Sequence, residues 1–283
     1  MVSVQTGQAL GKQLIGVVGG PMGAVGLRLS LAALLLLMVW RPSRTRRTRR
    51  LPADRESRLL ILAFGTAIAG MNLVYLAMER MPLGVAMTIQ LTGPLAVSLV
   101  TSRRPRDAMW GLLAAAGIAC FMLPGSSSSD PLSMTGLAFA VAAAVSMGAY
   151  LLLSQRAGAR MSGGEPLALA VLWAAFLTLP FAVAQSGTTR LVQPQALALA
   201  LLVALLSAAL PYSLELTALR RLPAGVVGVL QSLEPVAAGL AGLLLLGERL
   251  STLQWFAIAL ITTASVGAVA VHTSHRSRRA QPA

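Results

Sequence analysis

The sequence predicts an all-α polytopic membrane protein with ten transmembrane helices, the first of them short, arranged as two inverted five-helix repeats. Three observations lead to this fold class. Of the 283 residues, 56% are hydrophobic and only 11% are charged, and the mean hydropathy is +0.74. The apolar residues form runs long enough to cross a bilayer. A segment of the first half of the chain also recurs in the second half at a constant spacing.

Apolar segments of about 19 residues mark the expected helices. Nine are clear: 22–40, 59–78, 83–102, 108–124, 133–153, 166–185, 194–216, 224–246 and 253–272. A tenth, residues 2–20, is weaker because it contains Gln5, Gln8, Lys12 and Gln13, which are costly in hydrocarbon unless they face protein or water. We expect these four side chains to face a central cavity, and we expect the native protein to be longer at its N-terminus.

The arginines predict the orientation of the chain, because short cytoplasmic loops collect Lys and Arg. Eighteen arginines lie in 41–58, 103–106, 154–165, 220–221 and the tail after His272. The alternate loops contain only Arg80, Arg190 and Arg249. We therefore expect a cytoplasmic C-terminal tail, residues 273–283. The net charge of +14 does not indicate nucleic-acid binding, because the charges are confined to loops and only 5% of the residues are aromatic.

The internal repeat pairs Arg80, Pro82 and Gly84 with Arg221, Pro223 and Gly225, always 141 residues apart. Gln90 and Pro94 have the partners Gln231 and Pro235 at the same spacing. Five predicted spans separate the two copies, and an odd number inverts the second copy in the membrane. The sequence therefore predicts one repeat in residues 1–124 and another in 133–272. Inverted repeats with a binding site between them are typical of secondary transporters.

Three stretches of the chain resemble a known transporter family. They are TGPLAVSLVTSRRPRDAMWGLLA (92–114), SQRAGA (154–159) and the run from ALPYSLELTALRR to LLLLGERLS (209–251). Together they resemble the bacterial threonine/homoserine exporters, which belong to the EamA-type branch of the drug/metabolite transporter superfamily. Where such exporters often have Glu two residues before the TGP motif, this chain has Gln90.

The resemblance implies proton-driven export of small amino acids through the inner membrane of a bacterial cell, with the C-terminus in the cytoplasm. The expected partners are an amino-acid substrate, protons and the lipid bilayer, without nucleic acid, and the protein is expected to be a monomer or a homodimer. No cofactor and no metal are expected. The sequence also lacks a GxxxxGK[ST] phosphate-binding loop, which leaves an ion gradient as the energy source.

Charged residues inside spans are the first candidates for the transport site, because each is costly at a helix centre. They are Arg28, Glu215 and Glu234. Glu215 follows Pro211 and Glu234 precedes Pro235, so both lie near helix-breaking residues that free backbone carbonyls. We expect Glu215 or Glu234 to carry the proton. The alternative is an ion pair of Arg28 with Glu215 or Glu234 that only holds helices together.

Uncharged polar residues near these positions are candidates for substrate binding: Asn72, Tyr75, Gln90, Thr92, Tyr212, Ser213 and Gln231. Gln90 and Gln231 are repeat equivalents, so we expect them to face each other and to bind the ammonium or carboxylate of a zwitterion. The alternative for each of these groups is a hydrogen bond between helices.

Two alternatives to an amino-acid exporter follow from the sequence. A broader metabolite or drug efflux carrier of the same fold would have an aromatic-lined cavity, and the apolar spans contain few aromatic residues. A membrane enzyme would need catalytic clusters, but the chain has no HExxH motif, and its single cysteine, Cys120, lies in an apolar span. We therefore predict that the protein is a transporter and not an enzyme.

Overall fold

The computed structural model describes residues 2–39, 54–101, 108–122, 133–161, 164–211 and 232–279, and the regular elements in these ranges are helices. They are α1 (Val2–Val18), α2 (Pro21–Val39), α3 (Arg55–Met71), α4 (Val74–Met78), α5 (Leu83–Gln90), α6 (Thr92–Thr101), α7 (Ala108–Met122), α8 (Met134–Arg160), α9 (Glu165–Leu191), α10 (Pro194–Ala204), the π-helix η2 (Leu205–Ala209), α13 (Glu234–Leu246) and α14 (Thr252–Arg279). Helices overlap each predicted apolar segment, and the first part of 224–246 lies outside the described residues.

The helices have the length and the surface of membrane spans. Four segments are long and apolar enough to cross a bilayer: Pro21–Val39, Arg55–Met78, Met134–Arg160 and Glu165–Leu191. Large apolar side chains also cover the outside of the bundle, including Leu112, Phe176 and Leu244, which is 77% exposed. An apolar surface of this extent is unfavourable in water and suits lipid. The chain is a multi-pass membrane protein.

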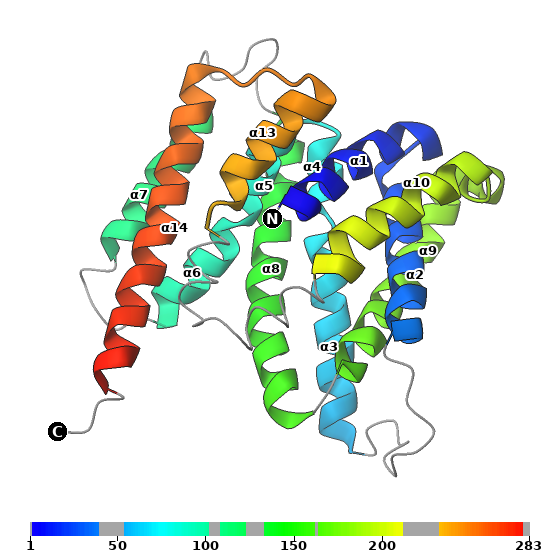
Figure 1. Cartoon of the computed structure of the whole chain (residues 1–283), viewed down its shortest axis with the longest axis horizontal. Coiled ribbons are helices and arrows are strands. Elements are labelled where there is room, and N and C mark those ends of the chain that lie inside the picture. The colour runs from blue at the N-terminus through cyan, green and yellow to red at the C-terminus, as the bar shows by residue number, and fades with distance from the viewer. Residues whose placement is uncertain are drawn as a thin grey trace.

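The most extensive helix contacts join the two halves of the chain. In Figure 1, α7 runs beside α14, and α5 lies against α13. Helix α2 packs on α9, α3 on α8, and α1 on α10. Because each of these pairs takes one helix from before residue 124 and one from after residue 133, the two halves share one core.

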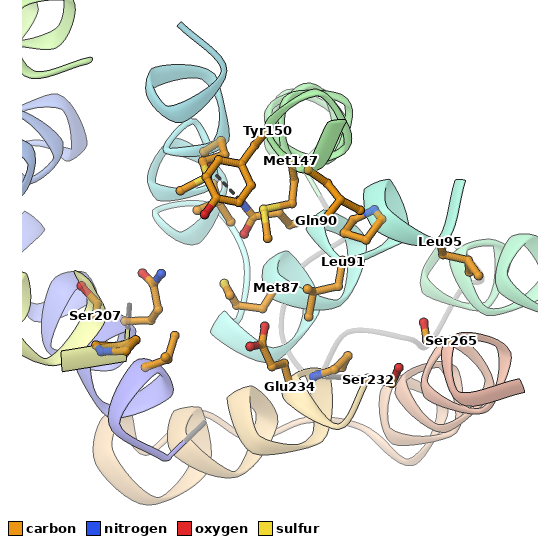
Figure 2. A pocket seen from close by; sticks show the side chains of 18 of the residues that line it. Met87, Gln90, Leu91, Leu95, Met147, Tyr150, Ser207, Ser232, Glu234 and Ser265 are labelled. Carbon is orange, nitrogen blue, oxygen red and sulfur yellow. Dashed lines mark hydrogen bonds between the residues drawn. The ribbon is translucent and has the colours of Figure 1, made fainter. Parts of the chain in front are cut away.

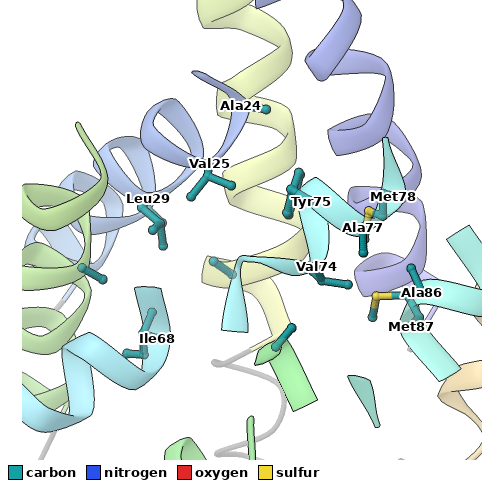
Figure 3. Close-up of a cluster of buried hydrophobic side chains, with 14 of the residues drawn as sticks. Ala24, Val25, Leu29, Ile68, Val74, Tyr75, Ala77, Met78, Ala86 and Met87 are labelled. Atoms are coloured by element: carbon teal, nitrogen blue, oxygen red, sulfur yellow. The ribbon is translucent and has the colours of Figure 1, made fainter. Parts of the chain in front are cut away.

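The centre of this core is formed by buried side chains of α2, α3, α4 and α5. Figure 3 shows Val25 and Leu29 of α2 near Tyr75 of α4, with Met87 of α5 on the other side of α4. Tyr75 has no exposed surface. Helix α4 is therefore enclosed by other helices and does not face lipid.

Glycines let the two halves approach at backbone distance. A Cβ atom on Gly93 of α6 would clash with the carbonyl oxygen of Ala144 in α8. On Gly65 of α3 it would clash with the carbonyl oxygen of Ala170 in α9. Neither contact leaves room for a side chain, so these glycines determine how closely the helices pack.

The ends of two helices have local determinants. Helix α3 begins after Asp54, whose carboxylate accepts a hydrogen bond from the Ser57 backbone N–H at 2.9 Å. The hydrogen bonds from Ser57 lower the pKa of Asp54. Helix α13 ends at Gly247, whose φ of 67° is readily adopted by glycine.

Candidate functional site

Helices from both halves of the chain enclose a cavity of about 390 Å³ (Figure 2). Its polar lining residues come from eight of the helices and the segments next to them: Gln8, Arg28, Asn72, Gln90, Tyr150, Ser207, Ser232, Glu234 and Ser265. The rest of the described lining is apolar and includes Met71, Met87, Pro94, Met147, Pro211 and Pro235. A small, partly polar cavity inside an apolar bundle is suited to a small hydrophilic ligand.

The break between α3 and α4 lies at the cavity wall. At Asn72 the backbone N–H turns back to the carbonyl of Ala69 instead of that of Ile68. The Asn72 side chain replaces the lost bond, because its Nδ2 donates to the carbonyl oxygen of Ile68 at 2.7 Å. This bond directs the other amide atom, Oδ1, toward Arg28.

Gln90 of α5 supplies a second hydrogen bond that the break between α3 and α4 lacks. The backbone N–H of Tyr75 bonds to the carbonyl of Asn72, so the carbonyl of Met71 has lost its normal helical donor. The Nε2 atom of Gln90 donates to this Met71 carbonyl at 2.7 Å (Figure 2). The Gln90 amide thus links α5 to the end of α3, and its residue also lines the cavity.

Arg28 is a buried cation in α2, with 5% of its surface exposed. Its Nε donates to the Ser207 hydroxyl at 2.9 Å, and its Nη1 donates to the Asn72 Oδ1. The guanidinium carbon lies 5.6 Å from the centre of the Tyr75 ring. In the part of the chain that the structure describes, no carboxylate pairs with Arg28.

The irregular helix that contains Ser207 leaves the oxygen atoms of this residue able to accept hydrogen bonds from Arg28. It lies in η2, and four residues later Pro211 has no N–H to donate to its carbonyl. The Nη2 of Arg28 lies 3.4 Å from this carbonyl oxygen. The Ser207 hydroxyl donates to Val203 at 2.6 Å, so its oxygen is left to accept from Arg28. Such π-helical insertions are frequent at functional sites.

Glu234 is the first residue of α13 and is followed by Pro235. Both residues line the cavity. Figure 2 shows the Glu234 carboxylate extending toward Met87 on the opposite wall. An acidic side chain is therefore present at the cavity, as the sequence predicts, although Glu234 and Arg28 form no ion pair.

The structure separates the ten predicted site residues into three groups. Arg28, Asn72, Gln90 and Glu234 are brought together around the cavity. Two do not line it. Tyr75 is fully buried behind Arg28, and the Thr92 hydroxyl donates to the Ile89 carbonyl of its own segment at 2.7 Å. The remaining four lie outside the described residues: Tyr212, Ser213, Glu215 and Gln231.

The four polar residues of the first helix are distributed differently from the prediction. Gln8 lines the cavity. Gln5 is buried beside it in α1 without a hydrogen-bond partner among the described residues, and Gln13 is exposed. Lys12 points to another contact, described below. Positions 5, 8 and 12 share one face of the helix, so residue spacing explains only the exposure of Gln13. Lys12 lies one turn beyond Gln8 and meets different neighbours, Met81 and Glu248.

Several lining residues were not predicted from the sequence, among them Met147, Tyr150, Ser207, Ser232 and Ser265. Met147 and Tyr150 are three residues apart and therefore lie on one face of α8. The serines lie in or beside apolar spans, where a polar side chain is a weak but readable signal. Among the described residues, no group of three or more His, Cys, Asp or Glu could hold a metal ion.

An ion pair joins three segments beyond one end of the cavity. The Lys12 ammonium lies 2.6 Å from Oε1 of Glu248 and also donates to the Met81 carbonyl at 2.9 Å. The second carboxylate oxygen of Glu248 accepts the Leu83 N–H at 2.7 Å. The side chains of Lys12 and Glu248 are only 22% and 14% exposed. We call this set of contacts the Lys12–Glu248 latch.

Comparison with known proteins gives a direct match. The chain is 41% identical over 268 residues to the threonine/homoserine exporter RhtA of Salmonella typhimurium strain SL1344, covering 94% of this chain and 88% of that protein. The chain belongs to the RhtA exporter family. RhtA of Escherichia coli K12 matches with the same identity and coverage. The resemblance read from the sequence is thus confirmed, and the protein is a transporter and not an enzyme.

More distant matches agree with this family. The EamA-like transporter family matches residues 134–270. An uncharacterized transporter of Bacillus subtilis strain 168, YwfM, is 28% identical over 162 residues, which cover 57% of this chain and 54% of YwfM. One protein crystal structure superposes with a TM-score of 0.61 at 17% identity, covering 96% of this chain and 97% of that one. This last match shows the fold alone.

Proposed function

We propose that the protein is a secondary-active exporter of small amino acids of the threonine and homoserine kind. The observation that carries the proposal is the 41% identity to RhtA across nearly the whole chain. The cavity agrees with it, because a cation, a carboxylate and an amide gather in a space suited to a small zwitterion. The protein acts in the bacterial inner membrane with its basic tail, residues 273–283, in the cytoplasm.

The proposed architecture is ten spans in two inverted repeats, residues 1–124 and 133–272. Here α3 with α4, α5 with α6, and α10 with η2 each form one span. The helix contacts support this symmetry. The pairs α2·α9, α5·α13 and α7·α14 join equivalent spans, and the pair α3·α8 becomes α10·α1 when the repeats are exchanged. A two-fold relation between the halves explains why these contacts occur together.

The cavity and the latch are consistent with an inward-facing state. Along α1, the lining residues Val4 and Gln8 precede Lys12 of the latch. Along α14, Ser265 and Ala268 lie far from the end that follows Glu248. The positive-inside rule supports an orientation in which the lining residues face the cytoplasm and the latch faces the outside. Export then requires the latch to open when the repeats rock.

Proton coupling follows from competition at an acidic side chain. A single carboxylate binds a proton or a substrate ammonium, but does not pair with the ammonium once it is protonated. Glu234 is positioned for this exchange because it lines the cavity. A proton arriving from outside would then be exchanged for an amino acid leaving the cell, which is antiport. Glu215 stays the second candidate for this role.

The test is efflux from proteoliposomes that contain the purified protein. Vesicles are loaded with radiolabelled threonine or homoserine, or with a lipophilic dye, and an inward proton gradient is imposed. We expect the gradient to accelerate efflux of the amino acids and not of the dye. Efflux of the dye would favour a broader efflux carrier of the same fold, and the absence of any gradient effect on the amino acids would refute proton coupling.

A further inference from the structure

Arg28 is an unusual residue for its position. It is the single charged residue of α2, a helix of 19 residues with the sequence PMGAVGLRLSLAALLLLMV. It is also almost completely buried. A cation in the middle of an apolar span is normally compensated by a carboxylate or serves a functional purpose.

The described partners of Arg28 hold its position but do not neutralise its charge. They are an amide oxygen, a hydroxyl and a backbone carbonyl, supplied by Asn72 and Ser207. Each partner is itself held in place, Asn72 by the Ile68 carbonyl and Ser207 by the Val203 carbonyl. The guanidinium therefore keeps a fixed orientation, and no carboxylate of the described residues pairs with it.

The guanidinium also retains hydrogen-bonding capacity toward the cavity. It has five N–H donors, and the three contacts to Asn72 and Ser207 use one on each nitrogen. One N–H on Nη1 and one on Nη2 have no partner among the described residues. Arg28 lines the cavity, so an anion there is within its reach.

We propose that Arg28 binds the carboxylate of the transported amino acid, and that Asn72 and Ser207 are its positioning residues. The proposal rests on the proposed function of amino-acid export and assigns the subsite for one end of the substrate. Two N–H donors on a planar guanidinium match the two oxygens of a carboxylate. The acidic Glu234 on another wall of the cavity is the complementary group for the ammonium.

Asn72 provides a sharp variant, because Asn72→Asp changes one atom and adds a carboxylate beside Arg28. The new anion would pair with the guanidinium and compete with the substrate. A purely structural role of Asn72 predicts an equal loss for both competitors, because an aspartate carboxylate cannot donate to the Ile68 carbonyl. The proposal instead predicts a loss of preference for ligands that carry a carboxylate.

The experiment measures competition with efflux of radiolabelled L-threonine from proteoliposomes. The competitors are unlabelled L-threonine and L-threoninol, in which the carboxylate is reduced to an alcohol. A hydrogen-bonded charge pair lost from a buried site is expected to weaken binding by about 10-fold to 100-fold. For the wild type we therefore expect L-threonine to compete at least about tenfold better than L-threoninol.

The variants separate the possible roles of Arg28. In Arg28→Gln and Asn72→Asp we expect the two competitors to become equally effective, and in Arg28→Lys we expect an intermediate preference. Arg190→Gln is the matched control, because it removes an exposed arginine that does not line the cavity. It should keep the wild-type preference.

Each result is decisive for one of the two proposals. Equal competition by the two ligands in the wild type would overturn the assignment of Arg28, even if the variants fail to fold. An unchanged preference in a folded Arg28→Gln variant would do the same and leave the exporter function intact. If the wild type transports neither L-threonine nor L-homoserine, the proposed function itself is wrong.

Discussion

The Lys12–Glu248 latch offers a direct test of the alternating-access proposal. In Lys12→Met, the Met81 carbonyl loses the Lys12 donor, and among the described residues the Glu248 carboxylate keeps the Leu83 N–H as its one partner. The variant should therefore destabilise the inward-facing state relative to the outward-facing state. Transport would no longer be limited by breaking this contact.

The expected change in the free-energy difference between the two states follows from the burial of the Lys12–Glu248 pair. Exposed ion pairs contribute about 0–1 kcal/mol, and removing one partner of a fully buried pair costs about 3–5 kcal/mol. The Lys12 and Glu248 side chains are 22% and 14% exposed, which lies between these limits. We expect Lys12→Met to destabilise the inward-facing state relative to the outward-facing state by about 2 kcal/mol, which is about a 30-fold shift in the ratio of the two states.

The assay is the rate at which a cysteine in the cavity is labelled from outside. Gln8→Cys is introduced together with Cys120→Ser, and spheroplasts are treated with a membrane-impermeant maleimide. Labelling should be faster in the Lys12→Met background. The matched control is Arg160→Met, which breaks an ion pair of the same 2.6 Å length whose two side chains are 52% and 75% exposed. An unchanged rate in Lys12→Met, or an equal increase in Arg160→Met, would refute the assignment of the latch.

Three further outcomes are expected. Glu234→Gln should insert into the membrane normally but lose pH-driven export in proteoliposomes. A normal pH dependence of export would instead assign the role of proton carrier to Glu215. Gly93→Ala should lower the free energy of unfolding of the purified protein by about 1–3 kcal/mol or more, because the new Cβ would meet the Ala144 carbonyl. Gly16→Ala is the control and should leave it unchanged, because nothing lies within 4 Å of the added Cβ. Gln90→Leu should raise the apparent KM for threonine, whereas substitution of the lipid-side Leu34 should leave it unchanged, and equal values would assign Gln90 to helix packing alone.

The membrane class and the placement of the helices could be predicted from the sequence. Hydropathy is a local property, because a span needs only enough consecutive apolar residues to match the bilayer. The structure accordingly has helices at the predicted segments, including the weak segment before residue 20. The cost of a buried charge is equally local, so Arg28 and Glu234 were identified without knowledge of their neighbours.

The contacts of these residues could not be predicted in the same way, because they depend on tertiary packing. Arg28 and Ser207 are 179 residues apart, and the acceptor capacity of Ser207 depends on a π-helix and on Pro211. Tyr75 was predicted at the binding site but is packed behind Arg28, because the break after Asn72 turns α4 into the core. The pairing of Lys12 with Glu248 depends on how α1 lies against α13. Contacts of this kind depend on the packing of segments distant in the chain, which the periodicity of any one segment does not specify.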